Sequence, residues 1–160
     1  MVDIKLRFTI LTILKVMMNG NNTYQQRQTV ANKGEDLFEA YCYEMDYSWQ
    51  RLGFDEKNNN VDAFYELNPL LRNLPDYLVH TKDAVFVVNV KGTANFKKKE
   101  IDMLPLFMEW YSAKKAQLVY AFCFEGQKPK LIYPEKLIEL YKKSQDRVWS
   151  DGVVYRNLEI

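Results

Sequence analysis

The sequence predicts a mixed α/β fold, a central sheet with helices on its faces, and two patterns carry that prediction. In three segments, apolar residues recur every three or four positions, which is the spacing of a helix with one buried face. Between them lie short runs rich in Val, Ile, Phe and Tyr, which favour strands. With 160 residues, 48% of them hydrophobic, the chain is long enough to bury its own core.

In the first half, the polar stretch from Asn19 to Asn32 predicts a loop or arm. We therefore divide the chain into an N-terminal helix or arm with a polar loop, 1–32, and a single domain, 33–160. A helix is predicted from Glu35 to about Leu52, with Gly53 as its stop. The remaining segments before the centre are predicted to be a polar loop at 55–60, a strand or irregular edge at 61–67 and a turn at 68–72.

At the centre, 77–79 and 84–90 predict two strands of a hairpin, and the second is apolar enough to be covered on both faces. The predicted elements that follow are a loop at 92–96, a helix at 97–115 that contains Pro105, strands at 118–124 and 130–133, a helix at 134–143 and a last strand at 153–155. The aromatic residues at helical spacing are expected in the core; they are Tyr41, Phe107, Trp110 and Tyr111.

Charge is divided unevenly between the two halves, although the formal net charge is only +1. Residues 1–80 hold 8 Lys/Arg against 11 Asp/Glu, and residues 81–160 hold 14 against 10. Such a division is expected where metal-binding carboxylates face a surface that meets phosphates, and it is also compatible with ordinary scatter of solvated charge.

Cys42 and Cys123 lie in apolar runs and the single histidine, His80, offers no partner for a zinc site. Both cysteines therefore predict buried thiols in a reducing compartment, and we expect a cytoplasmic protein. The apolar stretch from Phe8 to Met18 is interrupted by polar residues and is too short to span a bilayer, so no membrane association is expected.

Three polar residues converge in the predicted hairpin. Side chains alternate along a strand, so Asn89 and Lys91 point to the same side of the apolar run that contains them. A lysine that emerges from buried valines has to snorkel, pair with an anion or take part in chemistry. Asp76 follows Pro75 at the start of the neighbouring strand, and the short hairpin brings its carboxylate beside Asn89 and Lys91.

This pattern resembles the PD-(D/E)xK nuclease superfamily, which includes restriction endonucleases and Holliday junction resolvases, over roughly residues 33–133. Pro75-Asp76 matches the family's Pro-Asp, and Asn89-Val90-Lys91 matches its acid-x-Lys strand. The opening helix of the family carries a glutamate, for which Glu35 and Glu39, four residues apart, are both candidates. The resemblance implies a restriction-endonuclease-like mixed central sheet flanked by helices.

The departure from the family is Asn89, which stands where an Asp or Glu is usual. An amide oxygen coordinates Mg²⁺ without a carboxylate's charge and should hold it less tightly. A catalytically degenerate nuclease fold that grips DNA or a protein therefore stays open as an alternative. So does an α/β domain with a structural Lys91 and a protein partner.

The resemblance implies a Mg²⁺- or Mn²⁺-dependent endodeoxyribonuclease, such as a junction resolvase, a repair nuclease or a phage-type nuclease, that acts as a homodimer. Asp76 and Asn89 would bind the metal with Glu35 or Glu39, and Lys91 would position or deprotonate the attacking water. Lys97, Lys98 and Lys99 would hold the DNA backbone. Each feature also has a plain structural reading: Pro-Asp is a common turn, acidic residues favour the start of a helix, and a lysine run is usually solvated.

Overall fold

A computed structural model of the chain describes residues 24–52, 66, 71, 73–113 and 115–160. Its centre is a five-stranded mixed sheet in the order β1-β2-β3-β5-β6. The strands are β1 (Ser48–Arg51), β2 (Tyr77–His80), β3 (Val85–Lys91), β5 (Gln117–Phe122) and β6 (Lys130–Ile132). All neighbours are antiparallel except β3 and β5, which are parallel.

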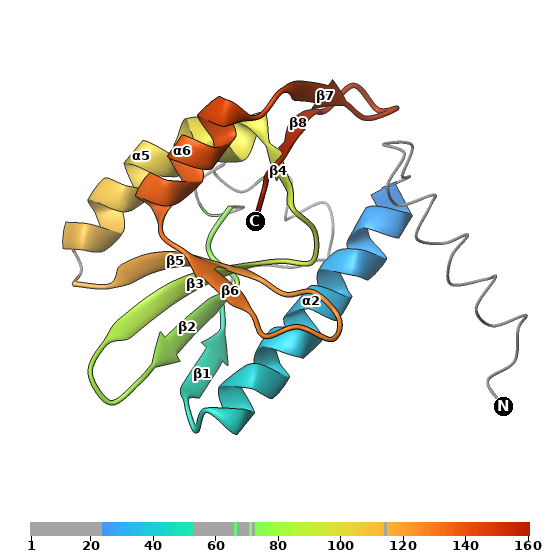
Figure 1. Ribbon diagram of the computed structural model, residues 1–160. Helices are drawn as coiled ribbons and strands as arrows, with labels where there is room; N and C mark the ends of the chain where they lie inside the picture. The colour runs from blue at the N-terminus through green and yellow to red at the C-terminus, as the bar shows by residue number, and fades with distance from the viewer. Residues whose placement is uncertain (1–23, 53–65, 67–70, 72, 114) are drawn as a thin grey trace, which may run out of the picture.

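Helices cover both faces of this sheet (Figure 1). Helix α2 (Tyr24–Glu44) lies on one face, and helices α5 (Lys98–Ala113) and α6 (Pro134–Lys143) lie on the other. Helix α5 is the crossover that parallel pairing of β3 with β5 requires. The fold class predicted from the sequence, a mixed central sheet flanked by helices, is confirmed.

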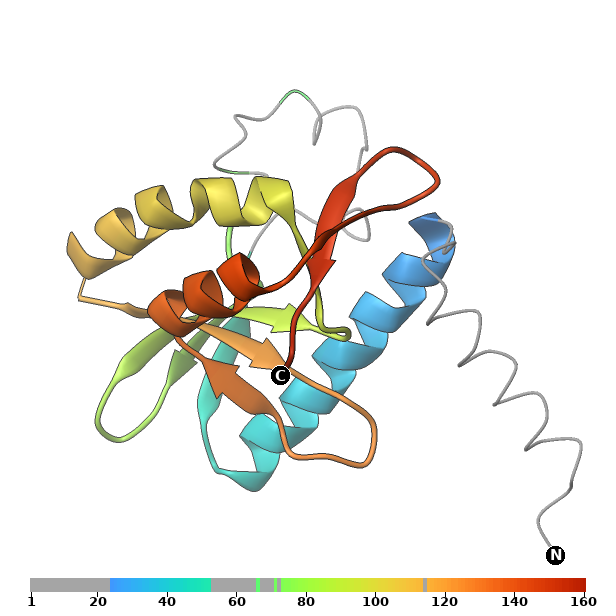
Figure 2. The same cartoon turned by 45° about the horizontal axis from the view of Figure 1, so that its top comes forward.

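A smaller antiparallel sheet, in the order β4-β8-β7, closes one end of the molecule. Its strands are β4 (Asn95–Lys97), β7 (Asp146–Val148) and β8 (Val154–Asn157). The hairpin of β7 and β8 reaches the start of α2 (Figure 2). There the Arg27 guanidinium forms an ion pair with Asp151 and lies 4.3 Å from the centre of the Trp149 ring.

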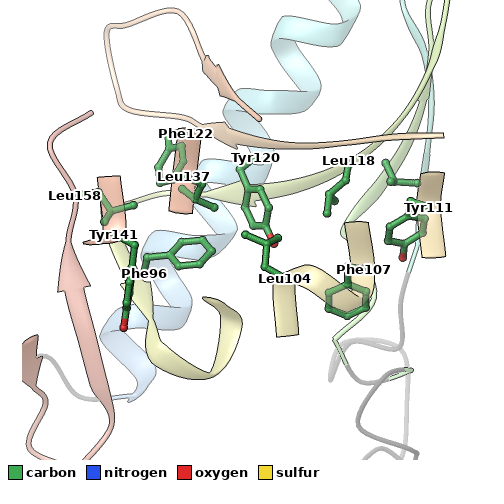
Figure 3. Close-up of a cluster of buried hydrophobic side chains, with 11 residues drawn as sticks. Phe96, Leu104, Phe107, Tyr111, Leu118, Tyr120, Phe122, Leu137, Tyr141 and Leu158 are labelled. Carbon is green, nitrogen blue, oxygen red and sulfur yellow. The ribbon is translucent and has the colours of Figure 1, made fainter. Parts of the chain in front are cut away.

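The core is divided by the sheet into two clusters. The larger one lies between the sheet and helices α5 and α6 and is rich in aromatic rings (Figure 3). In it, the fully buried Phe96 ring packs edge-on against Tyr120, with centroids 5.3 Å apart. The smaller cluster lies under α2 and includes Phe38, Tyr77 and both cysteines, which are buried and unbonded, as predicted. Both faces of β3 are therefore covered.

The largest departure from the sequence prediction is at α2. The helix begins at Tyr24, inside the stretch predicted as a loop, and ends at Glu44, well before Leu52. Gln, Arg and Ala residues in its first turns are good helix formers, and the helix contains one asparagine, Asn32. The helix stops because Asp46 adopts a left-handed φ of 55°, and Trp49 then lies in strand β1.

The hairpin, the crossover helix, both strands β5 and β6 and helix α6 lie where the sequence predicts them, within a few residues. Strand β7 was not predicted, and β4 lies inside the predicted loop at 92–96. Phe107 and Tyr111 are buried as expected, whereas Trp110 is 40% exposed and does not belong to the core. Some predictions lie outside the described residues, namely those for 1–23 and those for 53–72 apart from residues 66 and 71.

Candidate active site at the end of strands β2 and β3

Asp76 is fixed at the mouth of the β2–β3 hairpin by main-chain hydrogen bonds. Tyr77 pairs with Val88, and the residue before it, Asp76, donates its N–H to the Val88 carbonyl at 2.9 Å. In return, the Val90 N–H donates to Asp76 Oδ2 at 2.6 Å. The carboxylate is therefore held against the strand that carries Asn89 and Lys91.

Asn89 and Lys91 lie on the face of β3 that α5 covers. Val87, two residues earlier, belongs to the cluster under α5 and α6, and side chains two apart share a face. Tyr120, the partner of Asn89 on β5, lies opposite it in the sheet. Burial raises the pKa of Tyr120, so its hydroxyl stays neutral beside the Asn89 amide.

Lys91 forms an ion pair with Glu100, which lies in the first turn of α5. Both side chains are partly buried, with 19% and 25% of their surfaces exposed. The Lys91 Nζ also lies 5.2 Å from the centre of the Phe96 ring. Burial raises the pKa of Glu100, but the positive charges of Lys91 and Lys97 outweigh it, so the pKa is lowered and the group is a carboxylate.

Asp76 has an unusual protonation equilibrium for an aspartate. Its pKa is raised to about 6, chiefly by burial and also by the charges of Glu35 and Glu100, and the Val90 hydrogen bond and Lys91 limit the rise. A strongly perturbed carboxyl in a group of charged side chains is typical of functional sites. The same interactions also identify which acids lie in electrostatic reach of Asp76, and Glu35 and Glu100 are both among them.

The two candidate glutamates of α2 have different surroundings. Both form ion pairs with Arg51 at the end of β1, Glu35 at 3.0 Å and Glu39 at 2.8 Å. Glu39 also accepts a hydrogen bond from the Tyr77 hydroxyl at 2.7 Å, on the α2 side of the sheet. The charge of Glu35 is among those that raise the pKa of Asp76. Arg51 contacts both glutamates, and the contact with the Tyr77 hydroxyl distinguishes Glu39.

The lysine run is exposed at the start of α5. Lys97 is the last residue of β4, and Lys98 and Lys99 begin the helix. Lys98 forms an ion pair with Asp102, one turn further along, at 2.6 Å. Lys97 adjoins the site, because its N–H donates to Glu100, the ion-pair partner of Lys91.

A glycine pair determines how closely α2 approaches this site. A Cβ on Gly92 would lie 2.2 Å from the Val30 carbonyl oxygen, and a Cβ on Gly34 would lie 2.9 Å from the backbone of Gly92. Only hydrogen atoms at both positions allow the helix to cross the end of β3 at this separation. Glu35 follows Gly34, so the same contact brings its carboxylate toward Asp76.

The side chains of the candidate site determine which metal it could hold. Among the residues that the structure describes, no three His, Cys, Asp or Glu side chains gather closely enough to enclose a metal. Magnesium is usually held by one or two carboxylates with waters and substrate phosphates, and the oxygens of Asp76, Glu35 and Asn89 match that pattern.

Three residues that complete this site were not identified from the sequence: Glu100, Arg51 and Tyr120. Glu100 ends a Lys-Lys-Lys-Glu run that is typical of a solvated surface. Arg51 and Tyr120 lie on strands whose pairing brings them close, and nothing in their local sequence marks them. A conserved spacing between Lys91 and an acid in the next helix is the kind of signal that one sequence does not contain.

Comparison with protein-family models found no match, and comparison with curated protein sequences found none either. Among solved structures, the chain is similar to a Holliday junction resolvase from Archaeoglobus fulgidus. The two share 9% sequence identity with a TM-score of 0.45, and the match covers 78% of this chain and 85% of the resolvase. In the described part of the chain, no helix combines the length and apolarity that crossing a membrane would need.

Proposed function

We propose that this protein is a divalent-metal-dependent endonuclease that hydrolyses phosphodiester bonds in DNA. The observation that carries the proposal is the juxtaposition of Asp76, Asn89 and Lys91 at one end of the sheet, with Glu35 and Glu100 in electrostatic reach. An acid with a raised pKa next to an ammonium group suits a site that receives both a cation and an anionic substrate.

Asp76 and Glu35 would hold the metal, with the carbonyl of Asn89 as a neutral ligand. Bound there, Mg²⁺ would polarise the scissile phosphate and lower the pKa of an attacking water. We prefer Glu35 to Glu39 as the ligand because the charge of Glu35 acts on Asp76, whereas Glu39 accepts a hydrogen bond from the Tyr77 hydroxyl.

Lys91 would act as a fixed positive charge. Its ammonium group is paired with a carboxylate and lies over an aromatic ring. An ammonium held beside the scissile phosphate offsets the negative charge that grows on the phosphate oxygens during hydrolysis. The DNA backbone on either side of the scissile phosphate would be bound by Lys97, Lys98 and Lys99. This contact supplies affinity without sequence preference.

The test is cleavage of labelled single-stranded, duplex, flap and four-way-junction DNA in Mg²⁺, Mn²⁺ or EDTA. Metal-dependent cutting should be lost in Asp76→Asn and in Lys91→Gln and kept in Asp83→Asn, whose exposed side chain lies in the turn of the hairpin. Equal cutting by all four proteins would contradict the assignment of the site.

Asn89 makes the result with wild-type protein informative in a second way. If folded protein binds DNA and cuts nothing even in Mn²⁺, the chain is a DNA-binding protein with a degenerate nuclease site. Asn89→Asp then distinguishes a weak metal site from a lost one, because the added carboxylate should raise the affinity for Mn²⁺ only if the other ligands are present.

A homodimer is part of the proposal because cutting two strands of a duplex requires two sites. Sedimentation equilibrium with and without DNA tests it directly. A monomer under both conditions would limit the proposal to a nuclease that nicks one strand.

A further inference from the structure

Glu100 is held by two groups that belong to different elements. One carboxylate oxygen, Oε1, contacts the Lys91 ammonium on β3, and the other, Oε2, accepts the Lys97 N–H at the end of β4 at 3.0 Å. Both bonds use a side chain in the first turn of α5, where a negative charge is favoured by the helix dipole. The position of this carboxylate is therefore determined by the fold and not by one flexible contact.

Lys91 has few other constraints on its ammonium group. Its four-carbon stem is flexible, and the described contacts of Nζ are with Glu100 and with the ring of Phe96, 5.2 Å away. Phe96 is fully buried, so it offers a fixed surface for the stem. Glu100 determines where the Lys91 ammonium lies on that surface, because an aromatic face attracts a cation without fixing its orientation.

The negative charge beside Lys91 does not come from the neighbouring polar residue of the strand. Asn89, two residues earlier on the same face, is neutral and lies opposite Tyr120. The carboxylate in direct contact with the Lys91 ammonium is that of Glu100, nine residues further along the chain, whereas the charge of Lys91 acts on Asp76 without a hydrogen bond between them.

We propose that Glu100 is a positioning residue, which holds the Lys91 ammonium at the end of the sheet where Asp76 lies. The inference rests on the proposed nuclease function, since Lys91 needs a fixed position only if it acts on a substrate. A purely structural role, as the acceptor at the start of α5, is the competing explanation, because Glu100 also accepts the Lys97 N–H.

Two substitutions separate these roles. Glu100→Gln keeps an oxygen that can accept the Lys97 N–H and removes the charge that holds Lys91. Glu100→Asp keeps the charge and shortens the side chain by one methylene. Glu109→Gln, an exposed position on the same helix, is the matched control for loss of one acidic charge from α5.

The experiment measures kcat and KM of DNA cleavage for all four proteins on the substrate that the wild type cuts best. Glu100→Gln should lower kcat about 10- to 100-fold with KM changed by less than about 3-fold, since misplacing a group by about 1 Å has effects of this size. Glu100→Asp should recover part of the loss, and Glu109→Gln should match the wild type.

A second readout does not depend on cleavage. In ¹H–¹⁵N spectra of the lysine ammonium groups, Lys91 should give a slowly exchanging signal, assigned by its absence in Lys91→Gln. The signal should persist in Glu109→Gln and broaden beyond detection in Glu100→Gln.

The outcomes distinguish the two proposals. If the wild type cuts no DNA, the nuclease function is wrong and the positioning role is wrong with it. If the wild type cuts and Glu100→Gln equals Glu109→Gln in kcat, the positioning role alone is wrong. If Glu100→Gln does not fold, two other results decide. The absence of a slowly exchanging Lys91 signal in the wild type overturns the inference, and a lowered kcat at unchanged KM in Glu100→Asp supports it.

Discussion

Asp76 should make the fold less stable as it ionises. Its pKa is about 6 in the folded protein against an ordinary value of 3.8, mainly because of burial. The protonated form therefore favours the folded state. That contribution is fully present below the ordinary pKa and is lost as the pH rises through about 6.

The magnitude follows from the shift. Two pKa units correspond to about 3 kcal/mol, and partial exposure of the residue reduces what is measured to between about 1 and 3 kcal/mol. Asp76→Asn removes the titration and leaves an amide oxygen that can accept the Val90 N–H, which now donates at 2.6 Å. The variant should gain stability relative to the wild type as the pH rises, while it loses cleavage.

The assay is urea unfolding of wild type and Asp76→Asn at several pH values. Between about pH 4.5 and about pH 8 the difference in free energy of unfolding should move by about 2 kcal/mol in favour of the variant. Asp83→Asn, in the exposed turn, should show no such trend. A flat difference, or a trend of opposite sign, would refute the burial argument for Asp76.

Four further substitutions test the packing of the fold and the choice between the two glutamates. Gly92→Ala should lower the free energy of unfolding by about 3 kcal/mol, because the new Cβ would lie 2.2 Å from the Val30 carbonyl oxygen. Leu137→Ala should lower it by about 2–5 kcal/mol because the side chain is fully buried. Glu35→Gln should lower the cleavage rate at least about 10-fold. Glu39→Gln should instead lower stability by about 1 kcal/mol and leave cleavage intact, since its partners are structural.

Urea unfolding and cleavage kinetics check these predictions together with two controls. Gly126→Ala should lose only about 1 kcal/mol, because nothing lies within 4 Å of its Cβ position and only its φ of 74° opposes the change. Leu131→Ala, at a side chain that is 47% exposed, should change stability by less than about 1 kcal/mol. Losses in Gly92→Ala or Leu137→Ala no larger than in these controls would contradict the packing described here. Equal cleavage by Glu35→Gln and Glu39→Gln would contradict the assignment of Glu35.

The hairpin that carries Asp76, Asn89 and Lys91 was predictable because two apolar runs and a short turn define it locally. Strand β1 was not, because its four residues are all exposed and show no alternation. The first turns of α2 were missed because that part of the helix is polar, and its end depends on one residue, Asp46, in a left-handed conformation.

Some residues of the candidate site could be predicted from the sequence and others could not. Residues on one hairpin could be grouped by spacing alone. Glu100 and Arg51 could not, because each reaches its partner only after a helix has packed on the sheet or a strand has joined its edge. Choosing Glu35 over Glu39 also required the packed structure, since their position four apart on one helix makes them equivalent in sequence.

The contact between Arg27 and Asp151 has a consequence for how the protein is made. The two residues are 124 positions apart, so the start of α2 acquires its partner only after the β7–β8 hairpin has left the ribosome. Until then, Arg27 has neither the carboxylate of Asp151 nor the face of Trp149. A nascent chain that stalls before residue 149 would therefore carry the β2–β3 hairpin and helix α2 without the contacts that Asp151 and Trp149 make with the start of that helix.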